Sequence, residues 1–140
     1  MSFFNSNKKD YTVIIGCERL GSKLANTLSD EDRDVLIVDE CKDSFRRLSA
    51  NFGGLTISGD GMDITVLKEA KIDKSDALIV VTDDENVNIM IAQIAKKLFN
   101  CKKVTVRLYD IEKKVLCDDM GIETLCPVML SVENIKSLMQ

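Results

Sequence analysis

The sequence predicts an α/β protein: a doubly wound parallel sheet of about six strands with helices on both of its faces. First, apolar runs of strand length alternate with longer amphipathic stretches, a pattern typical of parallel sheets with helical crossovers. Second, 45% hydrophobic and 30% charged residues in a chain of 140 are typical of one globular domain with its own core. Third, a turn with two glycines joins the first strand to the first helix.

Short runs rich in Val, Ile and Leu predict the strands, which are residues 11–15, 35–38, 55–58, 77–81, 104–108 and 122–125. The first run ends at Gly16, and the second is stopped by Asp39. The run 77–81 is apolar at every position, as expected of a strand that is covered on both faces. The last run is the weakest signal of the set.

Stretches with apolar residues at helical spacing predict helices over residues 20–28, 41–51, 63–70, 85–99, 111–120 and 128–138. In the first of these, leucines at positions i, i+4 and i+8 fall on one face. We expect Asp63 to cap the third helix, and Asp83 or Asp84 to cap the fourth. Gly121 suits the end of the fifth helix, and Pro127 precedes the sixth.

The chain reads as one domain, residues 11–140, after a flexible N-terminal tail at residues 1–10. The tail lacks the apolar segment of a secretory signal, and no apolar run approaches the ~20 residues that cross a bilayer. Five cysteines without a C-x-x-C pair are then expected to be reduced thiols in a cytosol.

The charge balance and the missing histidine exclude several function classes. The 19 basic and 23 acidic residues give a net charge of −4, which argues against a nucleic-acid partner. With no histidine, the commonest general base, the Ser-His-Asp and Cys-His arrangements and most zinc sites are absent. We therefore expect a protein that is not an enzyme, with no catalytic residues and no metal site.

The sharpest motif lies between the first strand and the first helix. It consists of Gly16, Cys17, Glu18, Arg19, Leu20 and Gly21. This is where a Rossmann-like fold places its phosphate-binding turn, with Gly16 making the tight turn and Gly21 allowing close packing of the helix. The free amides and the positive dipole at the helix start attract an anion.

Acidic residues stand at two informative positions near this turn. Asp39, followed by Glu40, ends the second strand, where a carboxylate accepts hydrogen bonds from a ribose diol and favours NAD over NADP. Glu18 replaces the middle glycine that lets the backbone approach a pyrophosphate. Its bulk and charge are expected to weaken binding unless the side chain turns outward.

Four segments in order resemble the nucleotide-binding TrkA-N or RCK (regulator of K⁺ conductance) domains of bacterial potassium-transport regulators. They read VIIGCERLGSKLANTLSDEDRDVLIVDE, SGDGMD, ALIVVTDDENVNIMIAQIAKK and VTVRLYD. The resemblance runs from about Tyr11 to the end of the chain, and four motifs in register are far more specific than one glycine turn.

The resemblance implies a cytoplasmic, nucleotide-sensing regulatory subunit of a potassium uptake system, peripheral to the inner face of the membrane. It implies binding of NAD(H) or an adenine nucleotide (AMP, ADP or ATP) and gating of a membrane transporter or channel subunit. It also implies a homo-oligomer, as a dimer or a higher ring, or a hetero-assembly with another RCK chain. The family's second ligand-binding domain is not expected within these residues, so the subunit is expected to need a partner, either a transporter or a second RCK-bearing chain.

The resemblance also assigns residues to the site. The phosphate turn carries over to Gly16 and Gly21, with Arg19 reaching the phosphates, and the ribose acid carries over to Asp39. Positions matching other family motifs are Gly59 and Asp60 at the adenine end, Thr82 and Asp83 along the ligand cleft, Asn88, and Arg107.

Two other functions stay open on the sequence. One is a small NAD-dependent oxidoreductase, although Tyr109 and Lys113, which imitate a dehydrogenase pair, lack a serine partner. The other is a degenerate RCK scaffold that binds no nucleotide, which Glu18 favours. Arg19 and Arg107 could instead be surface ion-pair partners.

Two side-chain roles also stay open. The run Asp83-Asp84-Glu85 fits a divalent cation or, as we favour, a helix cap. Cys17 lies near a helix start and fits a redox-sensitive thiol or, as we favour, a buried inert one.

Overall fold

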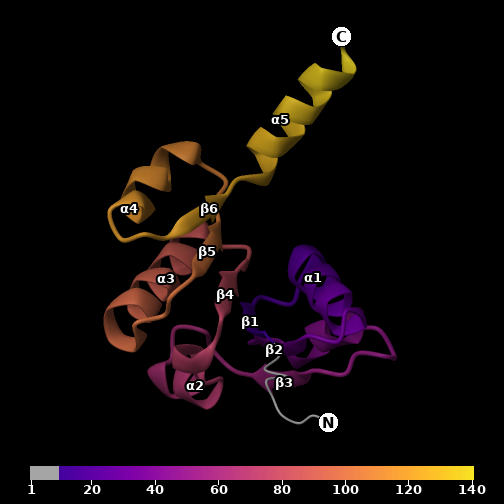
Figure 1. Cartoon of the computed structure of the whole chain (residues 1–140), viewed down its shortest axis with the longest axis vertical. Helices are drawn as coiled ribbons and strands as arrows, with labels where there is room; N and C mark the ends of the chain where they lie inside the picture. The colour runs from indigo at the N-terminus through magenta and orange to yellow at the C-terminus, as the bar shows by residue number, and fades with distance from the viewer. Residues whose placement is uncertain (1–9) are drawn as a thin grey trace.

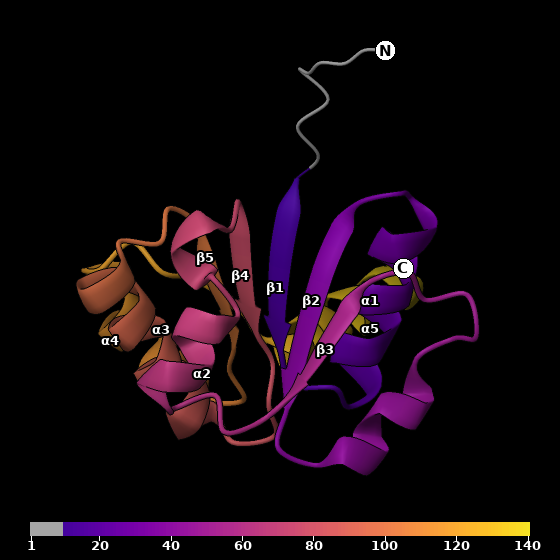
Figure 2. The same cartoon turned by 90° about the horizontal axis from the view of Figure 1, so that it is seen from below.

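The computed structural model describes residues 10–140. The predicted tail, apart from Asp10, lies outside these residues. Their strands form one all-parallel sheet in the order β3-β2-β1-β4-β5-β6, and Figure 2 shows β3, β2, β1, β4 and β5 side by side. The predicted fold class is therefore confirmed. The strands are β1 (Tyr11–Ile15), β2 (Asp34–Asp39), β3 (Leu55–Ser58), β4 (Ala77–Val80), β5 (Val104–Arg107) and β6 (Glu123–Leu125).

The strand order reverses between β1 and β4. Ile14 of β1 pairs with Ile37 of β2 on one side and with Ile79 of β4 on the other. The connections from β1 toward β3 and those from β4 toward β6 run over opposite faces of the sheet, so a crevice opens at the carboxyl ends of β1 and β4.

The helices cover both faces of the sheet. The α-helices are α1 (Arg19–Asp30), α2 (Ile64–Glu69), α3 (Glu85–Phe99), α4 (Val115–Asp118) and α5 (Pro127–Leu138). Three segments are 3₁₀ helices: η1 (Lys42–Arg47), η2 (Ile72–Lys74) and η3 (Ile111–Lys114).

Two predicted helices are shorter than the sequence pattern indicates. The stretch 41–51 holds only η1, because Leu48 turns to extended backbone and the Ser49 amide donates to the Asn26 side chain. The stretch 111–120 is divided between η3 and the single turn of α4. In both places tertiary contacts override the apolar spacing.

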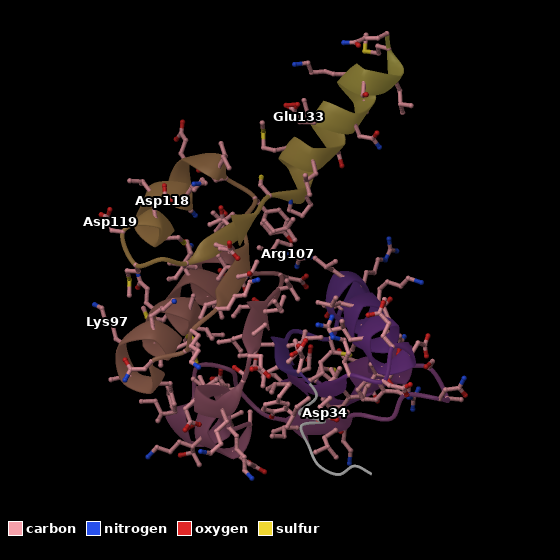
Figure 3. The ribbon with its side chains drawn as sticks, in the orientation of Figure 1. Asp34, Lys97, Arg107, Asp118, Asp119 and Glu133 are labelled. Carbon is pink, nitrogen blue, oxygen red and sulfur yellow. The ribbon has the colours of Figure 1, made fainter. Side chains whose placement is uncertain are left out.

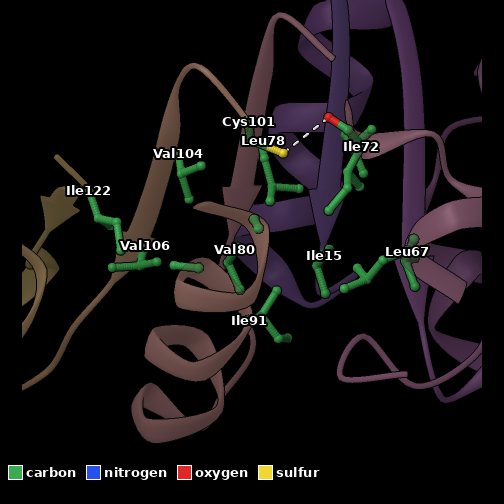
Figure 4. Close-up of a cluster of buried hydrophobic side chains, with 14 of the residues drawn as sticks. Ile15, Leu67, Ile72, Leu78, Val80, Ile91, Cys101, Val104, Val106 and Ile122 are labelled. Atoms are coloured by element: carbon green, nitrogen blue, oxygen red, sulfur yellow. Dashed lines mark hydrogen bonds between the residues drawn. The ribbon is translucent and has the colours of Figure 1, made fainter. Parts of the chain in front are cut away.

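The core has a layer on each face of the sheet. On one face α2, α3 and α4 pack over residues such as Val80, Ile91 and Val106, and Figure 4 shows this layer. The buried Cys101 thiol donates to the carbonyl oxygen of Ile72 at 3.2 Å within it. On the other face α1 and η1 cover Ile37 and its neighbours.

The predicted N-caps of α2 and α3 are confirmed, whereas α4 ends at Asp118, before Gly121, and α5 begins at Pro127 itself. The Asp63 carboxylate accepts from the Thr65 amide at 2.8 Å and so caps α2. Asp84, not Asp83, caps α3 by accepting from the Asn86 amide at 2.9 Å. Gly121 has a φ of +69°, the left-handed conformation that a glycine adopts without strain.

Helix α5 differs from the other α-helices, because none of its residues is buried. It extends away from the sheet, with the C-terminus at its tip (Figure 1). The side chains of Val128, Val132, Ile135 and Met139 follow at helical spacing and are 53%, 42%, 56% and 80% exposed. Among residues 10–140, no helix is long and apolar enough to cross a membrane.

Candidate functional site

A cavity of about 310 Å³ lies at the carboxyl ends of β1, β2 and β4. Eight residues that the sequence assigned to the site line it: Gly16, Glu18, Asp39, Glu40, Gly59, Asp60, Thr82 and Asp83. Six lining residues were not predicted: Ile15, Val38, Gly61, Asp84, Val87 and Ile91. The cavity occupies the point where the strand order reverses, the usual ligand position in open α/β sheets.

The turn between β1 and α1 has no room for a side chain at either of its glycines. Gly16 adopts a φ of +112°, and a Cβ there would lie 2.9 Å from the backbone nitrogen of Thr82. A Cβ on Gly21 would lie 1.8 Å from the carbonyl oxygen of Gly16. Helix α1 therefore begins directly over the turn, and Glu18 at its N-cap position forms no side-chain cap hydrogen bond. The first backbone amides of α1 therefore remain available to bind an anion.

The Asp39 carboxylate joins the two loops at this edge of the sheet. Its Oδ2 accepts a hydrogen bond from the Cys17 amide at 2.7 Å, and its Oδ1 accepts one from the Cys41 amide at 2.8 Å. Each carboxylate oxygen keeps a second lone pair. The half-buried carboxylate is thus held in place and can still accept from a hydroxyl in the cavity.

The other residues of the turn lie outside the cavity lining. Arg19 is exposed to solvent, and Leu20 packs against the core layer under α1. The Cys17 thiol is buried and donates to the carbonyl oxygen of Ser44 at 3.4 Å. Burial, with the nearby Asp39 carboxylate, raises the pKa of Cys17 to about 11. This supports the inert reading of the thiol, because a reactive cysteine needs a lowered pKa.

Asn88 is completely buried and joins the ends of β4 and β5. Its Nδ2 donates to the carbonyl oxygens of Thr82 at 3.1 Å and Arg107 at 3.0 Å. Its Oδ1 accepts from the Thr82 amide at 3.0 Å and from the Thr82 hydroxyl. The side chain is satisfied within the protein, so it positions the cavity wall at Thr82 and is not itself part of the lining.

Arg107 supports the same wall from β5. Figure 3 labels it at the end of that strand. Its guanidinium is 11% exposed, donates to the Thr82 carbonyl oxygen at 2.8 Å and lies 5.5 Å from the centre of the Tyr109 ring. Its Nη2 also approaches Asp83 at 3.4 Å, whereas its Nε has no partner among the described residues. Arg107 therefore acts on the cavity through Thr82.

The segment after β3 lines the cavity with Gly59, Asp60 and Gly61, two of which the resemblance assigns to an adenine end. The Gly59 amide donates to the Asp39 carbonyl oxygen at 3.0 Å, and the Asp60 carboxylate accepts from the Met62 amide at 2.8 Å. A Cβ on Gly61 would lie 2.7 Å from Cγ2 of Ile15. Gly61, the second glycine of the Gly-Asp-Gly run, could have been predicted as a lining residue from the sequence but was not.

The carboxylates after β4 do not gather around a cation. Asp84 caps α3, while Glu85 accepts from the amides of Tyr109 and Asp110 and pairs with Lys113 at 3.1 Å. These partners, the two amides first, lower the pKa of Glu85. No group of three Cys, Asp or Glu among residues 10–140 is placed to hold a metal ion. Lys113 is engaged by Glu85, and neither it nor Tyr109 lines the cavity.

Comparison with known families agrees with this geometry. Residues 12–127 match the model of the TrkA-N domain. The chain belongs to the TrkA-N family. Its resemblance to the family, inferred from the four sequence motifs, is thereby confirmed.

Two curated relatives share the TrkA-N sequence. The Trk system potassium uptake protein TrkA of Streptomyces coelicolor is 35% identical over 124 residues, which are 89% of this chain and 56% of the relative. A TrkA homolog of Pyrococcus horikoshii is 32% identical over 126 residues, which are 89% and 55% of the two chains. The chain therefore spans about half the length of these relatives.

Solved structures share the fold. The TrkA-N domain of the inner membrane protein ybaL from Escherichia coli has a TM-score of 0.84 at 13% identity, covering 96% of this chain and 99% of that one. The Shewanella denitrificans Kef CTD in an AMP-bound form has a TM-score of 0.70 at 18% identity, covering 92% and 82%. The GsuK channel bound to NAD has a TM-score of 0.71 at 14% identity, covering 87% and 22%.

Proposed function

We propose that this TrkA-N chain is a cytoplasmic regulatory component of a potassium uptake system that binds NAD(H) or an adenine nucleotide in the cavity. The observation that carries the proposal is the meeting of Gly16, Gly21 and Asp39 at the switch point of the sheet. A tight turn between two glycines, a helix start without a side-chain cap and a fixed carboxylate are the three parts that a phosphorylated ribonucleoside requires.

Each part of such a ligand has a matching region of the cavity. The ribose diol would donate to Asp39, the phosphate would face the amides that begin α1, and the adenine would lie toward Gly59 and Asp60 beside the apolar Val38. The AMP-bound and NAD-bound structures with the same fold support this choice of ligand class. Relatives named as potassium uptake proteins support the proposed system.

Regulation would follow from a difference in affinity. A nucleotide shifts an equilibrium between two states of an assembly only by as much as it binds one state better. The cavity wall at Thr82 is tied to β5 through Asn88 and Arg107, and β6 lies next to β5. A change in the wall is therefore coupled to the strand pair from which α5 departs.

The proposed assembly includes a second copy of the chain. Within one copy, no residue of the described part of the chain, 10–140, buries the apolar stripe of α5. On the sheet face opposite α3, Ile79, Thr105 and Leu125 are only half-buried, and Ile79 packs against the core layer under α1. Two apolar surfaces on one chain can cover each other in a symmetric pair, which makes a second copy the partner that we propose for α5. The transporter would bind this assembly.

A thermal-unfolding panel with AMP, ADP, ATP, NAD and NADH tests the proposed binding. A ligand at about 100 times its dissociation constant stabilises the folded state by about 2.7 kcal/mol. We expect a shift with at least one of the five and a smaller shift for Asp39→Ala. Asp34→Asn, at the opposite end of β2, is the matched control.

Two outcomes would contradict the proposal. If none of the five ligands shifts the unfolding temperature, the chain is a scaffold without a nucleotide. If the chain oxidises NADH in the presence of a carbonyl compound, it is an oxidoreductase, and the regulatory role fails.

A further inference from the structure

The cavity carries more negative charge than a ribose contact requires. Its lining includes six carboxylates and, among the described residues, no lysine or arginine. They are Glu18, Asp39, Glu40, Asp60, Asp83 and Asp84. A polyphosphate entering this space meets charges of its own sign at short range, where Coulomb repulsion is little screened.

Backbone amides already bind three of these carboxylates. Asp39 accepts from amides of two loops, Asp60 from an amide of its own loop, and Asp84 from amides at the start of α3, at distances between 2.7 and 3.2 Å. These contacts fix the loops and spread the carboxylate charge over neighbouring dipoles. Glu18 differs because it accepts no such bond from α1, although it occupies the N-cap position.

Glu18 instead faces a cation on the neighbouring loop. Its Oε1 lies 3.5 Å from Nη2 of Arg47 in η1, with the two side chains 38% and 46% exposed. The end of η1 is anchored to α1, because the Asn26 side chain donates to the Arg47 carbonyl oxygen and accepts from the Ser49 amide. The Asn26 side chain thus holds the main chain at Arg47 beside the glycine turn.

We propose that the Glu18–Arg47 pair selects nucleotides by phosphate charge, so that the cavity takes AMP or NAD(H) in preference to ADP and ATP. Glu18 stands next to the amides that would bind a phosphate, so its charge opposes each additional phosphate more strongly. Arg47 lowers this repulsion by neutralising Glu18 and is absent from the cavity lining. The inference rests on the proposed nucleotide binding and specifies its ligand class.

Calorimetry with AMP, NADH, ADP and ATP, all without divalent cations, tests the pair. Glu18→Gln keeps the size of the side chain and removes its charge. It is expected to tighten ATP about tenfold and AMP no more than about threefold. Asp43→Asn removes a carboxylate from η1 outside the cavity, and the order of affinities should then stay as in the wild type.

The role of Arg47 is tested by a double-mutant cycle. Arg47→Ala should weaken ATP more than AMP, and the loss should disappear in the Glu18→Gln background, because Arg47 acts through Glu18. Arg46→Ala, on the same helix and paired with Asp43, is the control. An equal loss in both backgrounds would mean that Arg47 binds phosphate directly, and the pair would have no selective role.

The results separate the inference from the function on which it rests. If the wild type binds ATP as tightly as AMP and Glu18→Gln leaves that ratio unchanged, the selectivity is refuted while nucleotide binding stands. If neither the wild type nor Glu18→Gln binds any of the four nucleotides, the proposed function itself is refuted. Urea unfolding of each variant verifies that it is folded.

Discussion

The α-carbon of Gly21 faces the carbonyl oxygen of Gly16 so closely that a Cβ atom would lie 1.8 Å from that oxygen. A side chain at residue 21 would therefore overlap with the backbone of the loop before α1. Both this contact and the positive φ of Gly16 determine the shape of the glycine turn.

Replacing Gly21 with alanine should destabilise the fold strongly. The methyl group cannot be placed without moving α1, and overpacking of this kind costs about 1–3 kcal/mol or more. Urea unfolding measures the loss. Gly53→Ala is the control, because its Cβ would meet only the Ser29 hydroxyl oxygen at 3.7 Å. Equal stability of both variants would show that the turn relaxes freely.

Replacing Asn88 with alanine should also destabilise the protein. The change removes the Asn88 partner of the Thr82 amide and of the Arg107 carbonyl oxygen, while the Thr82 carbonyl oxygen keeps its bond from Arg107, and unsatisfied buried groups cost about 1–3 kcal/mol each. Asn86→Ala, on the exposed side of the same helix, should lose far less. A nearly unchanged unfolding midpoint for Asn88→Ala would contradict the role given to this side chain.

Replacing Asp39 with alanine should weaken every ligand that contains a ribose, since the proposed ribose contact is lost. Isothermal titration calorimetry with NADH and AMP measures the change. Asp34→Asn is the matched control, since it lies at the amino end of the same strand. Unchanged affinities would place the ligand elsewhere than beside Asp39.

The buried thiols should make the fold sensitive to alkali. Burial raises the pKa of Cys17 and of Cys101 from 9.0 to about 11. The unfolded chain therefore ionises first, so stability is fully present below about pH 9 and declines as the pH rises toward 11. Urea unfolding between pH 8 and 10.5 measures this decline, which Cys17→Ser and Cys101→Ala together should reduce.

The same burial predicts selective alkylation. At neutral pH iodoacetamide should modify the exposed Cys41 first and leave Cys17 intact until the protein unfolds. Peptide mass spectrometry identifies the labelled position. Rapid labelling of Cys17 in the folded protein would restore a redox role for the turn.

Placing a charge on the apolar stripe of α5 should dissociate the proposed pair. Ile135→Asp adds a carboxylate in the middle of that stripe, and Ser137→Asp adds the same charge near the opposite side of the helix. Sedimentation velocity should show a smaller species for the first variant only. A wild type that is monomeric at high concentration would refute the pairing.

The alternation of apolar runs predicted the sheet because the central strands β1 and β2 are buried on both faces, whereas the edge strands β3 and β6 have no buried residue. Gly16 and Asp39 were also predicted by their position at the strand ends. The family resemblance, and not position, assigned Gly59, Asp60, Thr82 and Asp83 to the site. Arg47 was not predicted. Its approach to Glu18 depends on the short η1 and on the Asn26 contact, which are tertiary features that no local pattern encodes.

The outcome for Asn88 and Arg107 illustrates the same limit. The resemblance singled out both positions, and only the structure shows that they converge on the Thr82 backbone outside the cavity lining. Buried polar side chains at a strand end can bind a ligand or brace a loop, and the sequence contains the residue types but not their partners.

The joint between β6 and α5 is a single residue, Cys126, which is itself buried against the carbonyl oxygen of Tyr109. Because the connection is so short, α5 moves with the edge of the sheet as a rigid lever. At 1.5 Å per residue its 12 residues span about 18 Å, so a ten-degree tilt of the sheet edge carries the far tip through about 3 Å. A small movement of the strands at the crevice would thus displace the tip of α5 far enough to change its contact with a neighbouring subunit.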